Sequence, residues 1–524
     1  MGALSFPLTE GTPAARAHFN RGLLALHSFW YDEALRQFAA ASEADPSMNM
    51  AHWGQAMSHV KLLWGDDDVI AAKTALAAMP DPDKLSPYEK GWIAATTELL
   101  KPPDVLGSRL AFAKALEQLM TQFPADDEFA TFYALTLLST IRPENPDNLT
   151  IREKAAAIAE TVFKRNPKHP GAAHYLIHAD DTPALASKAL DAAKTYRLIA
   201  PAAFHAQHMP AHIFVRLGMW ADAIKSCQKA WDVSVATMQR NRLSANHVDI
   251  HSLQWLIEMP FELGHRKVAD DAMAKYALAI NTGVSRRYRS FYATEVASYL
   301  ARTSEWNRVD ELLAPLSSPP VEDGPGPGAT GQCGGGVSSA SELGEKIAVL
   351  ETRARAAAMQ HDVAGTKKLI TELDATRAQL APTLKASQPA ATVAAFDTQT
   401  SRLERELLAR AANDSAALIT VLREASADAH VDTGGESNPT AFLAEEELAD
   451  ALLGAKDPAK AAEAYAHVLT AQPNRAHSLL GAARAAAAQG DTKSAARSYA
   501  ALVTLWSDAE PTTPGLDEAR AAKP

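Results

Sequence analysis

Small residues, an aromatic residue and a proline recur at fixed intervals near the start of this 524-residue chain. Gly22, Ala34, Phe38, Ala41 and Pro46 follow one another at intervals of 12, 4, 3 and 5 residues. Small residues let two helices approach closely, an aromatic ring fills the gap between neighbouring helix pairs, and proline ends a helix. The pattern therefore predicts a hairpin of two packed helices, which needs further hairpins beside it to bury its apolar faces.

The same pattern returns near the other end of the chain. Ala461, Tyr465 and Pro473 follow the break at GAKDP, and Ala495 and Tyr499 follow the break at QGD. These are the intervals of tetratricopeptide repeats, and alanine-rich helical runs that close on a proline fill the sequence between the two matches. No stretch has the alternating pattern of a strand. The sequence predicts an all-α fold, a right-handed solenoid of tetratricopeptide-type helical hairpins.

One segment interrupts the helical runs. Residues 317–339, SSPPVEDGPGPGATGQCGGGVSS, are rich in glycine, proline and serine and poor in apolar side chains. The segment lacks the Gly-Lys-Ser/Thr signature and the preceding strand of a phosphate-binding loop, so a flexible linker is the better interpretation. We expect a longer N-terminal solenoid over residues 1–316 and a shorter set of helical repeats over residues 340–524.

Charge and cysteine content exclude several classes of function. The chain has 51 Lys and Arg against 62 Asp and Glu, and its net charge of -11 repels phosphate backbones, so nucleic acid is not expected as a partner. No apolar stretch reaches the roughly 20 residues that a membrane span needs, so no membrane insertion is expected. Cys227 and Cys333 lie far apart and outside any CxxC spacing, which indicates neither a disulfide framework nor a thiolate metal site.

The chain resembles a family of bacterial tetratricopeptide proteins almost from end to end. The resemblance is carried by FPLTEGTPAARAHFNRGLLALHSFWYDEA and PNRAHSLLGAARAAAAQGD and, most specifically, by the histidine phrases HPGAAHYLIHADDTP and FHAQHMPAHIFVRLGMW. It implies the helical-repeat fold but no particular activity. Members often have an export signal ahead of the phrase that begins at Phe6. We therefore expect a periplasmic location if such a signal precedes this sequence, and a cytoplasmic one for the sequence as it stands.

Histidine is concentrated in one part of the chain. An even distribution of the 17 histidines would place two or three in the 78 residues from His174 to His251, but this stretch contains seven. Six of them form pairs four residues apart, so that each pair shares one face of a helix: His174 and His178, His208 and His212, and His247 and His251.

The spacing between the pairs matches the repeat. His174 and His208 are 34 residues apart, as are His178 and His212, and His212 and His247 are 35 apart. Equivalent positions of successive repeats lie side by side, so we expect the three pairs to form one ladder along the concave groove. Imidazoles from helices about 8–10 Å apart can meet at one metal ion. The sequence therefore predicts a transition-metal site, and imidazole suits copper, iron and zinc alike.

Three charged residues fall on the same helical faces. Asp181 follows His178 by three residues and Glu258 follows His251 by seven. Either is a candidate metal ligand, a partner that fixes the tautomer of an imidazole, or a general base. Arg216, four residues after His212, is a candidate for holding an anionic group of a substrate.

Pro210 complicates the central pair. If a helix begins at Pro210, His208 belongs to the preceding loop and is outside the four-residue relation; if the helix runs through, it bends there. We therefore rank His212 above His208 as a ligand, and His205 lowest of the three.

The other histidines fit structural roles better. The aromatic-rich groups around His27 and around His52 and His59 indicate packing between the first hairpins, with a roof over the same groove as the alternative. His18, His265, His361, His430, His467 and His477 are scattered.

Two kinds of function fit these features of the sequence. The first is a metalloprotein with its ion in the histidine-rich groove, which would be an oxygenase or hydrolase acting on a small molecule if a coordination position is open, or a structural or carrier site if the shell is full. The alternative is a non-catalytic scaffold that binds a partner peptide or protein in the groove. Since no histidine cluster follows residue 339, we expect the C-terminal repeats to be dispensable for metal binding.

Overall fold

Helices make up the framework of the protein in a computed structural model. The structure describes residues 1–522 with the exception of 65–66, 102–103, 143–144, 322–340, 389 and 430–436. Within these ranges the elements are α-helices and short 3-10 helices, with no strand. The all-α prediction is confirmed. No helix in the described ranges combines the length and the apolar character needed to cross a bilayer.

The first nine helices form the N-terminal part of the array. They are α1 (Pro13–His27), α2 (Tyr31–Ala44), α3 (Asn49–Ser58), α4 (Val69–Ala77), α5 (Pro87–Leu99), α6 (Val105–Gln122), α7 (Asp127–Leu138), α8 (Asn148–Arg165) and α9 (Pro170–Asp180). The central helices are α10 (Leu190–Ile199), α11 (Phe204–His208), α12 (Pro210–Arg216), α13 (Trp220–Asn241), α14 (Ile250–Glu258), α15 (Arg266–Gly283), α16 (Arg286–Thr303) and α17 (Val309–Leu313).

The C-terminal helices complete the chain. They are α18 (Glu342–Met359), α19 (Val363–Ser387), α20 (Ala390–Ala411), α21 (Ser415–Ala429), α22 (Leu443–Gly454), α23 (Pro458–Ala471), α24 (Ala476–Ala488), α25 (Thr492–Leu505) and α26 (Leu516–Ala521). The 3-10 helices are η1 (Pro82–Lys84), η2 (Ala186–Ala189), η3 (Ala245–His247), η4 (Met259–Leu263), η5 (Trp306–Arg308) and η6 (Ala314–Ser317).

The recurring small and aromatic residues act as the sequence predicts. The fully buried ring of Phe38 in α2 lies between Gly22 of α1 and Gly54 of α3, where an added Cβ would come within 2.8 Å and 2.3 Å of ring carbons. Tyr465 in α23 is related to Gly481 of α24 in the same way, at 2.2 Å. Only hydrogen at these glycines leaves room for the aromatic ring, so the rings set the spacing of neighbouring helices.

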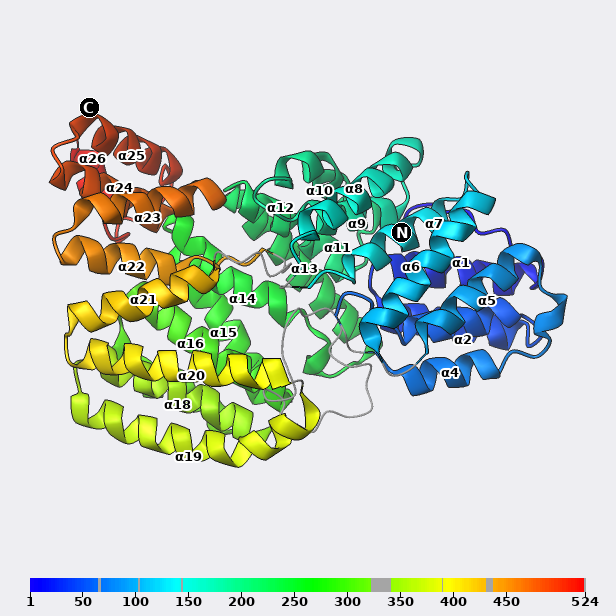
Figure 1. The fold of residues 1–524 in the computed structure, drawn as a ribbon, viewed down its shortest axis with the longest axis horizontal. Helices are drawn as coiled ribbons and strands as arrows, with labels where there is room; N and C mark the ends of the chain where they lie inside the picture. Colours follow the sequence, from blue (N-terminus) through cyan, green and yellow to red (C-terminus); the bar gives the residue numbers. More distant parts are fainter. Residues whose placement is uncertain are drawn as a thin grey trace.

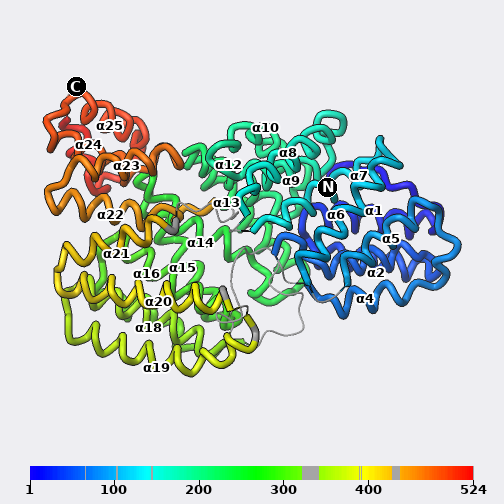
Figure 2. The backbone as a smooth tube through the Cα atoms, in the orientation of Figure 1, coloured from blue at the N-terminus to red at the C-terminus, as the bar shows by residue number. Residues whose placement is uncertain are grey.

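Helices α1–α7 lie at one end of the molecule and α22–α26 at the other, with α8–α13 between them (Figures 1 and 2). The chain then passes through α18–α21 and returns to the central helices. In this return the indole of Trp220 donates to the carbonyl of Asn474 at 2.8 Å, and the backbone N–H of Ala476 donates to buried Glu262 at 2.6 Å. Residues 437–522, which include helices α22–α26, are here called the C-terminal block. These contacts dock the block on α13 and η4.

The predicted linker at 317–339 lies from residue 322 onward outside the described residues, as does Cys333. The division of the chain at this segment stays a prediction. The parts on either side of it are in contact, since α18 packs on α16 and the C-terminal block docks on α13 and η4.

Candidate metal centre

Six histidines gather into two groups of three. Site 1 consists of His174, His178 and His205, and site 2 consists of His208, His212 and His251. Within each site the potential ligand nitrogens lie within 4.8 Å of one another. Three imidazoles that converge in this way can bind a single transition-metal ion once small side-chain movements bring each nitrogen to about 2.0–2.1 Å from it.

Four short helices carry these histidines, and two of them, α9 and α12, begin with proline. Pro170 opens α9, where His174 and His178 lie one turn apart on one face, as predicted. At Pro210 the chain neither starts a helix after a loop nor continues one helix without a break. Helix α11 ends at His208 and α12 begins at Pro210, and only Met209, itself in helical conformation, lies between them. His208 thus keeps its four-residue relation to His212 across the break.

The three imidazoles of site 1 meet through their Nε2 atoms. Nε2 of His174 lies 3.0 Å from Nε2 of His178 and 3.0 Å from Nε2 of His205. The Nδ1 atom of His174 is 2.7 Å from the backbone carbonyl of His27, which can only accept a hydrogen bond. His174 therefore carries its proton on Nδ1, and its Nε2 presents a lone pair to the centre of the site.

Aromatic rings enclose site 1. The ring centroid of Phe29 lies 4.4 Å from that of His174, 5.6 Å from that of His178 and 5.5 Å from that of His205. The ring of Tyr196 stacks on His174 with a centroid distance of 4.9 Å. Phe29 has a φ of 51°, a left-handed conformation that is strained for a bulky side chain. Such strain persists where the surrounding structure requires a particular side-chain position. Here it places an apolar ring across all three imidazoles.

In site 2, hydrogen bonds fix the tautomer of His208. Its Nδ1 lies 2.8 Å from the hydroxyl of Ser252, and that hydroxyl donates its own proton to Asp249 at 2.5 Å. Burial raises the pKa of Asp249 to about 6, so its carboxyl group is ionised and accepting at neutral pH. The Ser252 oxygen is therefore left to accept from Nδ1 of His208, and Nε2 of His208 carries a lone pair.

A carboxylate fixes the tautomer of His212. Its Nδ1 lies 3.2 Å from Oδ2 of Asp181, whose Oδ1 accepts from Arg216 at 2.9 Å. Burial alone would raise the pKa of Asp181, but the charge of Arg216 and the hydrogen bonds from His212 and the N–H of Ser437 hold this pKa below its usual range. Asp181 is thus an acceptor, His212 is protonated on Nδ1, and its Nε2 also carries a lone pair.

The imidazoles of His208 and His212 meet through their Nε2 atoms, which are 3.1 Å apart. His251, the partly exposed member of the site, packs on His208 at a ring distance of 4.6 Å. The three rings of site 2 therefore converge as those of site 1 do.

A third group, His27, Glu128 and His169, is satisfied without an ion. Burial lowers the pKa of His27, so this ring is neutral; its Nε2 donates to Glu128 at 2.7 Å and its Nδ1 accepts from Tyr175 at 2.9 Å. His169 accepts the N–H of Ala172 on Nδ1 and donates from Nε2 to Glu128 at 3.0 Å. Since each ring nitrogen has a matching partner, this group is a structural network. It supports site 1, because the carbonyl of His27 holds His174.

His247 is not where the sequence places it. It lies in η3, partly exposed, with its Nδ1 3.2 Å from the hydroxyl of Ser244, and it is absent from both sites. The reason is the start of α14: Asp249 caps this helix by accepting the N–H of Ser252, so helical structure begins at Ile250, after His247. The prediction of a continuous ladder of three pairs is wrong; the histidines divide into two groups of three.

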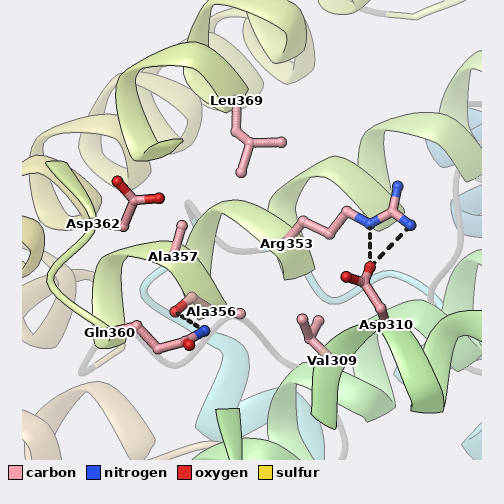
Figure 3. A pocket seen from close by; sticks show the side chains of 8 residues that line it. All are labelled: Val309, Asp310, Arg353, Ala356, Ala357, Gln360, Asp362 and Leu369. Atoms are coloured by element: carbon pink, nitrogen blue, oxygen red, sulfur yellow. Dashed lines mark hydrogen bonds and ion pairs between the residues drawn. The ribbon is translucent and has the colours of Figure 1, made fainter. Parts of the chain in front are cut away.

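The groove expected around the histidines is also corrected, because the sites are buried. His174 is 0% exposed and His212 is 1% exposed. A hollow of about 450 Å³ lies elsewhere, between α17, α18 and α19, and none of its eight lining residues is a histidine. Figure 3 shows the side chains that line it. Its Arg353 is paired with Asp310. The hollow is therefore separate from the histidine chemistry.

Two of the predicted charged residues contact a site directly or through one partner, and one does not. Asp181 contacts His212. The guanidinium of Arg216 donates to both the carboxylate and the backbone carbonyl of Asp181. Glu258 lies outside both trios, with its Oε2 3.5 Å from Nε of Arg302. Glu258 instead affects a neighbouring carboxyl group: burial is the larger cause and the negative charge of Glu258 the smaller cause that raise the pKa of Glu295 well above its usual range.

Sequence reasoning missed or undervalued three residues. His205, ranked lowest, is a member of site 1; its position three residues before His208, on the same turn, was the available signal. His27 holds His174 through its backbone carbonyl, which no side-chain pattern reveals. Ser437 contacts both Asp181 and His212 from a distant part of the chain, and no local pattern marks it.

Comparison with known proteins gives no family. No protein-family model and no curated protein matches the chain. Solved structures with some similarity include yeast Tom70, with 11% identity over 93% of this chain and 90% of that chain and a TM-score of 0.31. Naa15/Naa10 bound to HypK-THB has 14% identity, 80% and 63% coverage and a TM-score of 0.28, so this chain spans less than two thirds of it. The P58(IPK) TPR domain has 12% identity, 97% and 98% coverage and a TM-score of 0.17. Since the TM-scores are this low, the fold assignment rests on the helices of the chain itself.

Proposed function

We propose that this helical-repeat protein binds transition-metal ions at site 1 and site 2, through the Nε2 atoms of its buried histidines. The observation that carries the proposal is the convergence of three imidazoles in each site, with Nε2 atoms 3.0 Å apart in site 1 and 3.1 Å apart in site 2. On the opposite ring nitrogens, His208 contacts Ser252 and His212 contacts Asp181, which is the usual support of a metal-binding histidine. Copper, zinc and iron are the metals that an all-imidazole set suits best.

The burial of both sites favours a metal that is held by the protein over one that meets a large substrate. Site 1 is enclosed by aromatic rings, and in site 2 only His251 is partly exposed. A reaction as an oxygenase or hydrolase on a small molecule would require access along the His251 side. Metal retention without turnover is therefore the first expectation of the proposal.

Metal analysis of protein purified without a nickel column tests the proposal. We expect up to two equivalents of copper, zinc or iron, restored by reconstitution after removal with a chelator. X-ray absorption at the metal edge should show a first shell of nitrogen at about 2.0–2.1 Å. If a folded, reconstituted protein holds no metal, the metal proposal fails.

A protein-binding scaffold is the second candidate, favoured by the architecture itself. Arrays of helical hairpins present extended surfaces that commonly bind partner chains. A stable complex of defined stoichiometry with a protein from the source cells, formed equally well by metal-free protein, would favour this candidate over the first.

A further inference from the structure

Ser437 reaches site 2 from a part of the chain more than two hundred residues away. Its backbone N–H donates to Oδ2 of Asp181 at 2.6 Å, and its hydroxyl donates to the carbonyl of His212 at 3.0 Å. The same hydroxyl oxygen lies 3.2 Å from Nδ1 of His212, where it shares the ring N–H with Asp181. Ser437 is 3% exposed, so these contacts are made away from water, where hydrogen bonds to charged groups are strong.

The C-terminal block fixes the position of Ser437. The next two residues are held through their carbonyls, since Gln472 donates to Asn438 at 3.0 Å and Arg475 donates to Pro439 at 2.6 Å. Arg475 is fully buried and also paired with Glu446 at 2.6 Å. The turn before α24 thus sets where the segment from Ser437 lies.

The same turn docks the block on the central helices. Glu262 in η4 accepts the N–H of Ala476 at 2.6 Å, and its carbonyl accepts the indole N–H of Trp506 at 3.2 Å. The indole of Trp220 in α13 donates to Asn474 beside Arg475. Docking and the placement of Ser437 therefore depend on the same few residues.

We propose that Ser437 is a positioning residue for site 2, and that through it metal binding at site 2 and docking of the C-terminal block strengthen each other. The inference rests on the proposed metal binding. Ser437 contacts His212 and donates to Asp181, whose carboxylate holds Nδ1 of His212, so Ser437 orients the His212 ring with its Nε2 toward the centre of site 2. Because two linked equilibria affect each other by the same factor, a metal ion that requires this His212 orientation must also hold the block in place.

Zinc titration of the full chain against a chromophoric chelator measures the first half of this coupling. The site 2 step is assigned as the one lost in His212→Ala. Ser437→Ala removes the hydroxyl that orients His212, and loss of such an outer contact typically weakens metal binding about 10–100-fold. The matched control is Thr470→Val, which removes a hydroxyl from an exposed position of the same block. We expect the control and the site 1 step to stay within about two-fold of the parent.

Amide hydrogen exchange measures the second half. Zinc should slow exchange of residues 437–450 and 472–480 in the parent and in Thr470→Val, and this slowing should be reduced in Ser437→Ala. A merely structural role of Ser437 would change exchange in the metal-free protein but not its response to zinc.

Two results separate the inference from the proposed function. Zinc binding in the parent with unchanged site 2 affinity in Ser437→Ala, or with no effect of zinc on exchange of the block, would overturn the coupling and leave metal binding intact. Absence of zinc binding in the parent would overturn both.

Discussion

Three of the imidazoles proposed to bind metal are oriented by the group that their Nδ1 atom contacts. His174 donates to a backbone carbonyl, His208 to a serine hydroxyl and His212 to a carboxylate. A carboxylate acceptor makes an imidazole more basic than a neutral acceptor does, so His212 is the strongest of these donors to a cation. Arg216 prevents Asp181 from taking the proton itself, because its charge favours the ionised carboxylate.

His212 should therefore be essential for metal at site 2. We expect His212→Ala to lose the site 2 metal and to retain that of site 1, and His178→Ala to show the reverse. His467→Ala, which removes an exposed histidine paired with Glu445, should retain both. Metal content measured beside helical circular dichroism checks this. Full metal content in folded His212→Ala would remove site 2 as a metal site.

The carboxylate behind His212 gives a second prediction. Asp181→Asn keeps the shape of the side chain but removes the charge that orients His212, so we expect site 2 affinity to fall about 10–100-fold. Asp180→Asn is the matched control, since burial raises the pKa of Asp180 to about 7 and the neutral amide resembles its protonated form. Chelator competition measures both variants. Equal weakening by the two would point to a general effect on α9 and not to the contact with His212.

At the scale of helices, the sequence predicts what depends on local periodicity. Spacing alone predicts the hairpins, the pairing of His174 with His178 and the seating of Phe38 against Gly22. It misplaces His247, because a helix start depends on a capping side chain that competes with periodicity.

Local periodicity carries no information about contacts between distant segments. Ser437 and the carbonyl of His27 are therefore outside its reach. The same limit explains why the sequence predicts dispensable C-terminal repeats, whereas Ser437 contacts site 2.

The contact between the ring of Phe38 and Gly54 predicts that alanine substitutions at two glycines have different effects on stability. An alanine Cβ at Gly54 would lie 2.3 Å from the ring of Phe38, whereas at Gly454 it would meet nothing within 4 Å. We expect Gly54→Ala to lower the free energy of unfolding by about 1–3 kcal/mol through overpacking. Gly454→Ala should be neutral or stabilising by up to about 1 kcal/mol, because alanine favours helix. Urea denaturation of both variants measures this, and equal stabilities would contradict the proposed role of the ring.

Across the whole molecule, the C-terminal block lies at the end opposite α1–α7 and docks on the central helices. Buried charges make this contact: Glu262 is 1% exposed and lies between Arg302, at 3.2 Å, and Arg475, at 3.8 Å. Buried ion pairs add little net stability compared with apolar packing, but removing one partner is costly because it leaves a charge without its counterion. Docking should therefore be sensitive to a change at Glu262.

Glu262→Gln should loosen the C-terminal block without unfolding the rest. The amide cannot balance the charges of Arg302 and Arg475, and loss of one partner from a buried pair costs about 3–5 kcal/mol. Relative to the parent, we expect faster hydrogen exchange over residues 437–450 and 472–480 and unchanged exchange over α2 and α3. The affinity for metal should fall more at site 2 than at site 1. Glu305→Gln is the control: Glu305 pairs with Arg266 at the surface, where such pairs contribute about 0–1 kcal/mol, and it should leave the block protected. If Glu262→Gln leaves exchange of the block at the parental rate, the block is held by contacts other than Glu262, and the weakest point of the docking surface lies elsewhere.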